Sequence, residues 1–98
     1  MLRTLEINPN EISYYMIRGH ILLKIGEFDK AISDYSRVIQ SGTNKEDIGG
    51  AYYHRSVAYY DKKEYDNSWR DLHKAEEYGF EAKLEFIKEL KNKSGREK

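Results

Sequence analysis

An internal repeat constrains this chain more than any other feature, because a shift of 37 residues aligns two of its segments. Tyr15-x2-Arg18-Gly19-x2-Leu22 falls on Tyr52-x2-Arg55-Ser56-x2-Tyr59, and Asp34-Tyr35-x2-Val38 falls on Asp71-Leu72-x2-Ala75. A single helical hairpin cannot bury its own apolar face, whereas stacked neighbours can. The repeat therefore predicts a stack of helical hairpins.

The helix boundaries follow from apolar spacing and from a few helix-ending residues. Pro9 is the only proline of the chain, and apolar residues after it recur at helical spacing. This predicts five helices, over residues 11–25, 27–41, 45–61, 64–78 and 81–93. Gly26 and Gly42 are expected to end the first two helices in the left-handed conformation, and Gly79 to end the fourth. Asn44 is expected to cap the third.

Composition excludes several classes of protein. The 98 residues include 17 Lys+Arg and 17 Asp+Glu, a formal net charge of zero, which disfavours nucleic acid or a membrane surface as partner. Apolar runs such as Ile21-Leu22-Leu23 are too short for a transmembrane helix or a signal-peptide core. The chain has no cysteine, which fits a reducing compartment. We therefore expect a cytoplasmic location.

The order of aromatic and small residues resembles that of the tetratricopeptide repeat (TPR) family. It is carried by Tyr15, Gly19, Leu22, Ala31 and Tyr35, and again by Tyr52, Ser56, Tyr59, Ser68 and Leu72. The resemblance implies an all-α solenoid of TPR-type hairpins in a single domain, residues 1–93. Its expected parts are the end of a preceding repeat (1–11), two full repeats (12–44 and 49–79) and a capping helix (80–93), followed by a disordered tail (94–98).

Two pairs of residues are expected to hold each hairpin together. A small residue of the first helix faces a small residue of the second, which lets the helices approach closely. Arg18 and Arg55 occupy equivalent positions, and Asp34 and Asp71 each follow 16 residues later. Because the pair recurs, an ion pair within each hairpin is favoured over an anion-binding site.

In a stack of this kind, the first helices of the hairpins line a concave groove, which the resemblance makes the expected peptide-binding surface. The residues predicted to line it are Met16, Ile17, His20, Lys24, Tyr53, His54, Val57, Tyr60 and, from the last helix, Lys88. His20, His54 and Lys88 could form a weak anion site whose histidines titrate near pH 6.5. The alternative is that the last helix folds back and covers the groove.

No catalytic motif stands out, so we expect a protein that is not an enzyme and needs no cofactor or metal. His20 and His54 lie on adjacent first helices but lack acidic companions for zinc. The predicted function is a scaffold that binds a peptide or protein segment in its groove. The alternative is assembly or homo-oligomerisation through the exposed repeat edge, beside the N-terminal residues Leu2, Leu5 and Ile7. Lys24 is the only fixed cation expected on the groove side of the two first helices, which disfavours nucleic acid as a partner.

Overall fold

The computed structural model describes residues 9–98. This part of the chain forms five helices and no strand. The helices are α1 (Pro9–Lys24), α2 (Phe28–Ser41), α3 (Lys45–Asp61), α4 (Tyr65–Glu77) and α5 (Leu84–Ser94). The prediction of an all-α chain is confirmed. Most of the predicted end of a preceding repeat, including Leu2, Leu5 and Ile7, lies outside the described residues.

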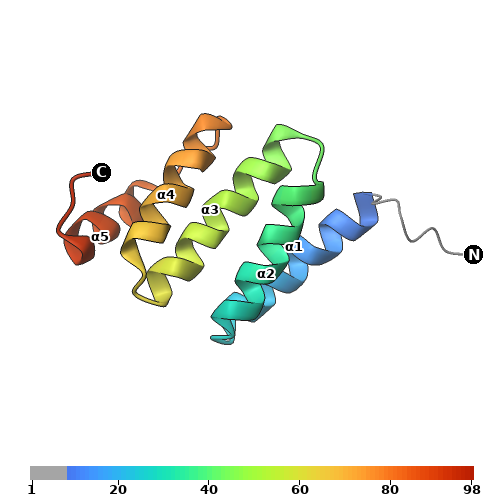
Figure 1. The fold of residues 1–98 in the computed structure, drawn as a ribbon, viewed down its shortest axis with the longest axis horizontal. Coiled ribbons are helices and arrows are strands. Elements are labelled where there is room, and N and C mark those ends of the chain that lie inside the picture. The colour runs from blue at the N-terminus through green and yellow to red at the C-terminus, as the bar shows by residue number, and fades with distance from the viewer. Residues whose placement is uncertain (1–8) are drawn as a thin grey trace, which may run out of the picture.

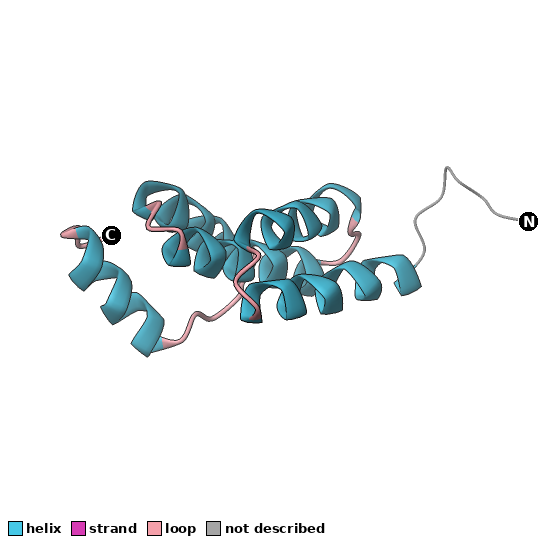
Figure 2. Ribbon diagram, turned by 90° about the horizontal axis from the view of Figure 1, so that it is seen from below, coloured by secondary structure: helices cyan, strands magenta, loops and turns pink. Residues whose placement is uncertain are grey.

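The first four helices stand side by side as two hairpins, α1 with α2 and α3 with α4, and α2 also packs against α3 (Figure 1). Asp29 near the start of α2 pairs with Lys62 just after α3, at 2.6 Å, so these two helices run in opposite directions. Helix α5 stands apart at the far end, joined to α4 by a loop (Figure 2). Helix α1 is thus the first helix of the described row, and α5 is the last.

Turn or cap chemistry explains a helix boundary in each of the four connections. Gly26 and Gly79 have φ of 87° and 84°, the left-handed conformation that was predicted for Gly26. Lys63 holds the same type of turn, with φ of 68°, at the position equivalent to Gly26. The Asn44 side chain accepts a hydrogen bond from the backbone N–H of Asp47 at 2.7 Å, which confirms the predicted cap of α3.

Two boundary predictions are wrong. Gly42 is extended, with φ of −69° and ψ of 152°, rather than left-handed. The chain runs on in an extended path to Asn44, so it needs no left-handed residue at that point. The last helix begins at Leu84 instead of residue 81. The chain before it is held by Phe80, which packs on the ring of Tyr53 and delays the start of the helix.

The core consists of two clusters. The first joins the hairpins, because it combines Ala51 of α3 with residues of α1 and α2: Ile12, Ala31, Tyr35 and Val38. The second ties α3, α4 and α5 together through Tyr53, Trp69, Leu72, Ala75 and Leu90. Among residues 9–98, no helix is long and apolar enough to cross a membrane.

The close approach of the helices in the second hairpin rests on two small residues, as predicted. The hydroxyl of Ser56 donates to the backbone carbonyl of Ser68, and the hydroxyl of Ser68 donates to the carbonyl of Ser56. In the first hairpin the ring of Tyr35 lies only 2.7 Å from the place where a Cβ on Gly19 would stand. Gly19 is therefore required by that ring rather than by a second small residue.

Candidate functional site

The two predicted arginine–aspartate pairs are both formed. Arg18 donates to both carboxylate oxygens of Asp34 at 2.8 Å, and Arg55 donates to those of Asp71 at 2.7 and 2.9 Å. The aspartate of each pair is buried. Each guanidinium is already engaged by a carboxylate in a two-point contact, which supports the structural role over the anion site.

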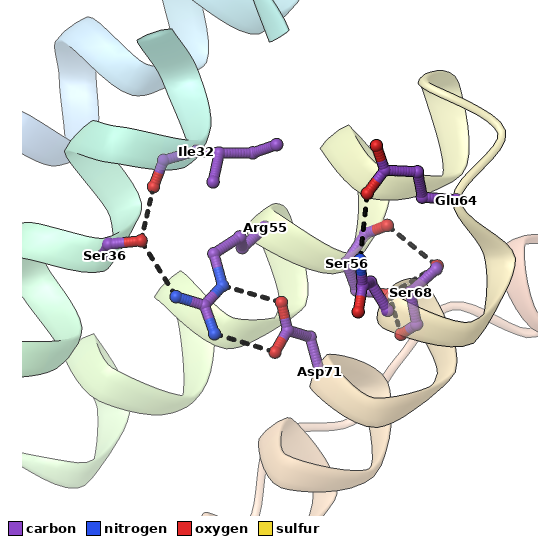
Figure 3. Close-up of polar contacts among 8 residues, drawn as sticks. Ile32, Ser36, Arg55, Ser56, Glu64, Ser68 and Asp71 are labelled. Atoms are coloured by element: carbon purple, nitrogen blue, oxygen red, sulfur yellow. Dashed lines mark hydrogen bonds and ion pairs between the residues drawn. The ribbon is translucent and has the colours of Figure 1, made fainter. Parts of the chain in front are cut away.

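The two pairs differ in what surrounds them. Arg55 also donates to the hydroxyl of Ser36 on α2, at 2.9 Å, and so ties two hairpins together (Figure 3). The equivalent nitrogen of Arg18, Nη1, donates instead to the hydroxyl of Tyr14, four residues earlier on the same helix. The Arg18 side chain is 46% exposed, whereas that of Arg55 is 18% exposed. Within residues 9–98, no helix lies before α1 to cover the first pair in the way that α2 covers the second.

His20 and His54 meet, as their positions in the repeat predicted. Their ring centroids are 4.4 Å apart, and Nδ1 of His20 lies 2.7 Å from the hydroxyl of Tyr35 and shares a hydrogen bond with it. Burial lowers the pKa of His20, and burial lowers that of His54 to about 4, helped by the nearby charges of His20 and Lys83. The expected titration near pH 6.5 is therefore wrong for this pair.

Lys88 does not join the two histidines. It lies exposed on α5 beside a shallow hollow lined by Glu85, Glu89 and Asn92, all from the same helix. The cation that acts on His54 is Lys83, in the loop before α5. The predicted anion site of two histidines and Lys88 is thus not assembled. Residues 9–98 contain no group of three or more side chains suited to hold a metal ion.

The second half of the predicted groove is covered. Tyr53 is 6% exposed, because its ring stacks on Phe80 at 4.8 Å and meets the edge of Phe86 at 5.6 Å. Tyr60 also packs against Phe86 and donates a hydrogen bond to Glu89 on α5, and Val57 belongs to the same cluster. The alternative to an open groove was a C-terminal segment that folds back over it, and this is the arrangement observed for the second half.

The first half of the groove is partly filled. Met16 is half-buried and comes within 3.7 Å of the place where a Cβ on Gly50 would stand, beside Phe80. Lys24 and Ile17 are exposed. Among the nine residues predicted to line the groove, Ile17 is the large apolar side chain that remains open to solvent.

Ile17 belongs to an apolar surface that the groove prediction missed. Tyr14, Ile17, Ile21 and Ile25 follow one another at spacings of three, four and four residues, and each is between 54% and 66% exposed. This spacing places all four on one side of α1 and its last turn. We call this surface the α1 stripe.

The repeat itself contains a signal for the α1 stripe. A shift of 37 residues places Tyr14 on Ala51 and Ile21 on Ala58, and both alanines are fully buried in α3. The side of α3 that packs in the stack thus corresponds to the side of α1 that is exposed. Comparing the two first helices for residue size at these positions would have drawn attention to α1.

The C-terminal end of the chain contacts α4 through several side chains. Trp69 donates its indole N–H to the hydroxyl of Ser94 at 3.0 Å, and Leu90 is fully buried against the Trp69 cluster. Arg96 pairs with Asp66 at 2.7 Å and lies over the ring of Trp69. Ser94 and Arg96, which belong to the tail predicted to be disordered, thus contact residues of α4. The ring of His73 packs against that of Trp69.

Comparison with known proteins adds no assignment. The chain matches no model of a known protein family, and no curated protein or solved structure gives a significant match.

Proposed function

We propose that this chain is a TPR-type helical-repeat module that mediates protein–protein interaction and carries out no catalysis. Support comes from the two hairpins, which share the arginine–aspartate pair and the left-handed turn at equivalent positions. Such hairpins stack through their neighbours, so an end helix offers an apolar side to whatever lies next to it. Interaction through packed helices is the activity that this architecture favours.

The observation that carries the proposal is the α1 stripe. Monomeric proteins rarely leave a contiguous group of large apolar side chains in water, and such groups mark interaction sites. Here three such side chains lie in one row on α1 and a fourth, Ile25, follows in the turn after it, each more than half exposed. At the positions equivalent to Tyr14 and Ile21, α3 carries Ala51 and Ala58, and both are fully buried in the stack. The edge of the stack is therefore a better candidate for the binding surface than the groove over Tyr53, which is already occupied.

The peptide-groove function keeps a smaller role in this proposal. The open end of the groove, with Ile17 and Lys24, adjoins the α1 stripe, so a bound partner would contact both. The covered end would accept a peptide only after Phe80 and Phe86 leave Tyr53. Partner binding is thus expected to depend on Ile17 and Ile21 far more than on Tyr53 or Tyr60.

The test is a comparison of partner capture by matched variants. The purified wild-type chain, the double variant Ile17→Glu/Ile21→Glu and the control Leu84→Glu are used as baits in the same extract. Leu84 is a 72% exposed apolar residue at the other end of the molecule, so its variant makes a similar change elsewhere. Loss of a specific set of partners in the double variant alone supports the proposal. Identical sets for all three baits would refute it.

A further inference from the structure

The side of α1 that carries the stripe is a helix-packing side. In α3, the equivalent side holds Ala51 and Ala58, both fully buried, and Arg55 reaches across to Ser36 of α2. In α1, Arg18 contacts Tyr14 of its own helix, and residues 9–98 include no helix before α1 that could supply an equivalent of Ser36. The repeat therefore indicates that the occupant of the α1 stripe is another α-helix, lying beside α1.

The size of the stripe residues restricts this helix further. Alanine at positions 51 and 58 permits close approach, whereas Tyr14 and Ile21 project into the space that the next helix would occupy. An occupant with large apolar residues at complementary spacing would interdigitate with them, as side-chain ridges do in helix pairs. The α1 stripe of a second copy has this complementary spacing. In an antiparallel pair of α1 helices, Tyr14 faces Ile25 of the other copy and Ile17 faces Ile21.

We infer that the occupant is α1 of a second copy, so that the chain forms a symmetric homodimer through its α1 stripes. This inference rests on the proposed interaction function and names its partner. The C-terminal end supports it, because α5 already covers the Trp69 side of α4. Head-to-tail stacking, in which α4 of one copy would pack on α1 of the next, is therefore disfavoured. Pairing stripe with stripe is isologous and closes at two copies.

Charge near the dimer axis does not oppose this pairing. Arg18 borders the stripe, and two copies would bring two guanidinium groups near each other. Each of them is bound at two points by its own Asp34, so the pair carries little net charge into the contact. Lys24, the other cation of this helix, is exposed and free to stay in water.

The experiment measures mass by light scattering after size exclusion, over a wide range of protein concentration. For wild type we expect the mean mass to rise from one chain to two. The variant Ile17→Glu/Ile21→Glu should stay at one chain throughout, and Leu84→Glu should behave as wild type. A wild type that stays monomeric at every concentration, or a double variant that still dimerises, overturns the inference. Because the altered residues are exposed, circular dichroism should show unchanged folding in all three.

Cross-linking tests the orientation, since the chain has no cysteine of its own. An equal mixture of the single variants Ile17→Cys and Ile21→Cys should oxidise to mixed disulfide dimers several-fold faster than either variant alone. A mixture of Ile17→Cys with Leu84→Cys should show no such acceleration. Equal rates for the mixture and the single variants would reject the antiparallel pair.

The alternative occupants give distinct results. If residues 1–8 cover the stripe, a chain of residues 9–98 dimerises while the full chain does not, and the inference fails. If a helix of another protein is the occupant, wild type remains monomeric but the capture experiment still depends on Ile17 and Ile21. In that case the interaction function stands and only its partner is wrong. Failure of both experiments would refute the function as well.

Discussion

The two ends of the helix stack carry apolar side chains that meet very different surroundings. At the C-terminal end, α5 buries Leu90 completely against Trp69 and Leu72 of α4. At the N-terminal end, Ile17 and Ile21 of α1 are more than half exposed. The chain thus closes one end of the stack with its own residues, through the loop and helix that follow α4. The comparison locates the surface where another helix is expected.

The arginine–aspartate pairs show the same contrast at equivalent positions. Arg55 and Asp71 lie between neighbouring helices on both sides, whereas Arg18 is half exposed and contacts its own helix. The residue types and the bonded atoms are the same, so the difference comes from position in the stack alone. The same arginine–aspartate pair is therefore more exposed to water on an end helix than on an internal one.

The largest effect is expected where α5 covers the C-terminal end of the helix stack. Leu90→Ala removes a fully buried side chain from the contact between α4 and α5, and such truncations cost about 2–5 kcal/mol of unfolding free energy. The matched change Ile21→Ala, at the open end, should cost less than about 0.5 kcal/mol in dilute protein. Urea denaturation of both variants measures the difference. Equal losses would mean that α1 is covered in the monomer or that α5 does not pack.

The next effect compares the two ion pairs. Asp71→Asn leaves the guanidinium of Arg55 in a buried site without a counter-charge, at an expected cost of about 2–3 kcal/mol. Asp34→Asn should cost only about 1 kcal/mol, because water reaches the half-exposed Arg18. Thermal unfolding of both variants provides the measurement. A larger loss for Asp34→Asn would contradict the ranking of the two sites by exposure.

The boundary between open and covered regions lies at the histidine pair, and pH tests it. Burial lowers the pKa of His54 to about 4, below its value in the unfolded chain. The unfolded state then binds more protons between about pH 6.5 and 4, so stability falls as pH falls through that range. We expect about 2 kcal/mol to be lost at pH 5 through His54. In His54→Gln this part of the pH dependence should vanish. An unchanged slope would place His54 in water.

Sequence reasoning reached the parts of the molecule that depend on local spacing. The repeat of 37 residues placed Arg18 with Asp34 and Arg55 with Asp71, and it brought His20 beside His54. Contacts between distant segments were harder to predict. In the loop after Gly79, Phe80 packs on Tyr53, and no local sequence pattern predicts that contact. The same contact covers the predicted groove, and Phe80 also lies near the ring of His54.

The smallest expected effect concerns the tail that follows the cap. Arg96 pairs with Asp66, which is almost fully exposed, and lies over the ring of Trp69. Exposed pairs contribute little, so Arg96→Ala should change the unfolding free energy by less than about 0.5 kcal/mol. Trp69 is the only tryptophan of the chain, so its fluorescence reports on this contact directly. We expect a measurable change in its emission without a change in the denaturation midpoint.

Leu90→Ala is the matched comparison for that spectroscopic test, because it should shift both the emission and the midpoint. Removing Arg96 loosens only the chain end over the ring, whereas removing the Leu90 side chain opens the packing beneath it. If Arg96→Ala lowered the midpoint as much as Leu90→Ala, the tail would have to be part of the cap. The capped end would then extend to the last residues of the chain, and the contrast with the bare side of α1 would be larger still.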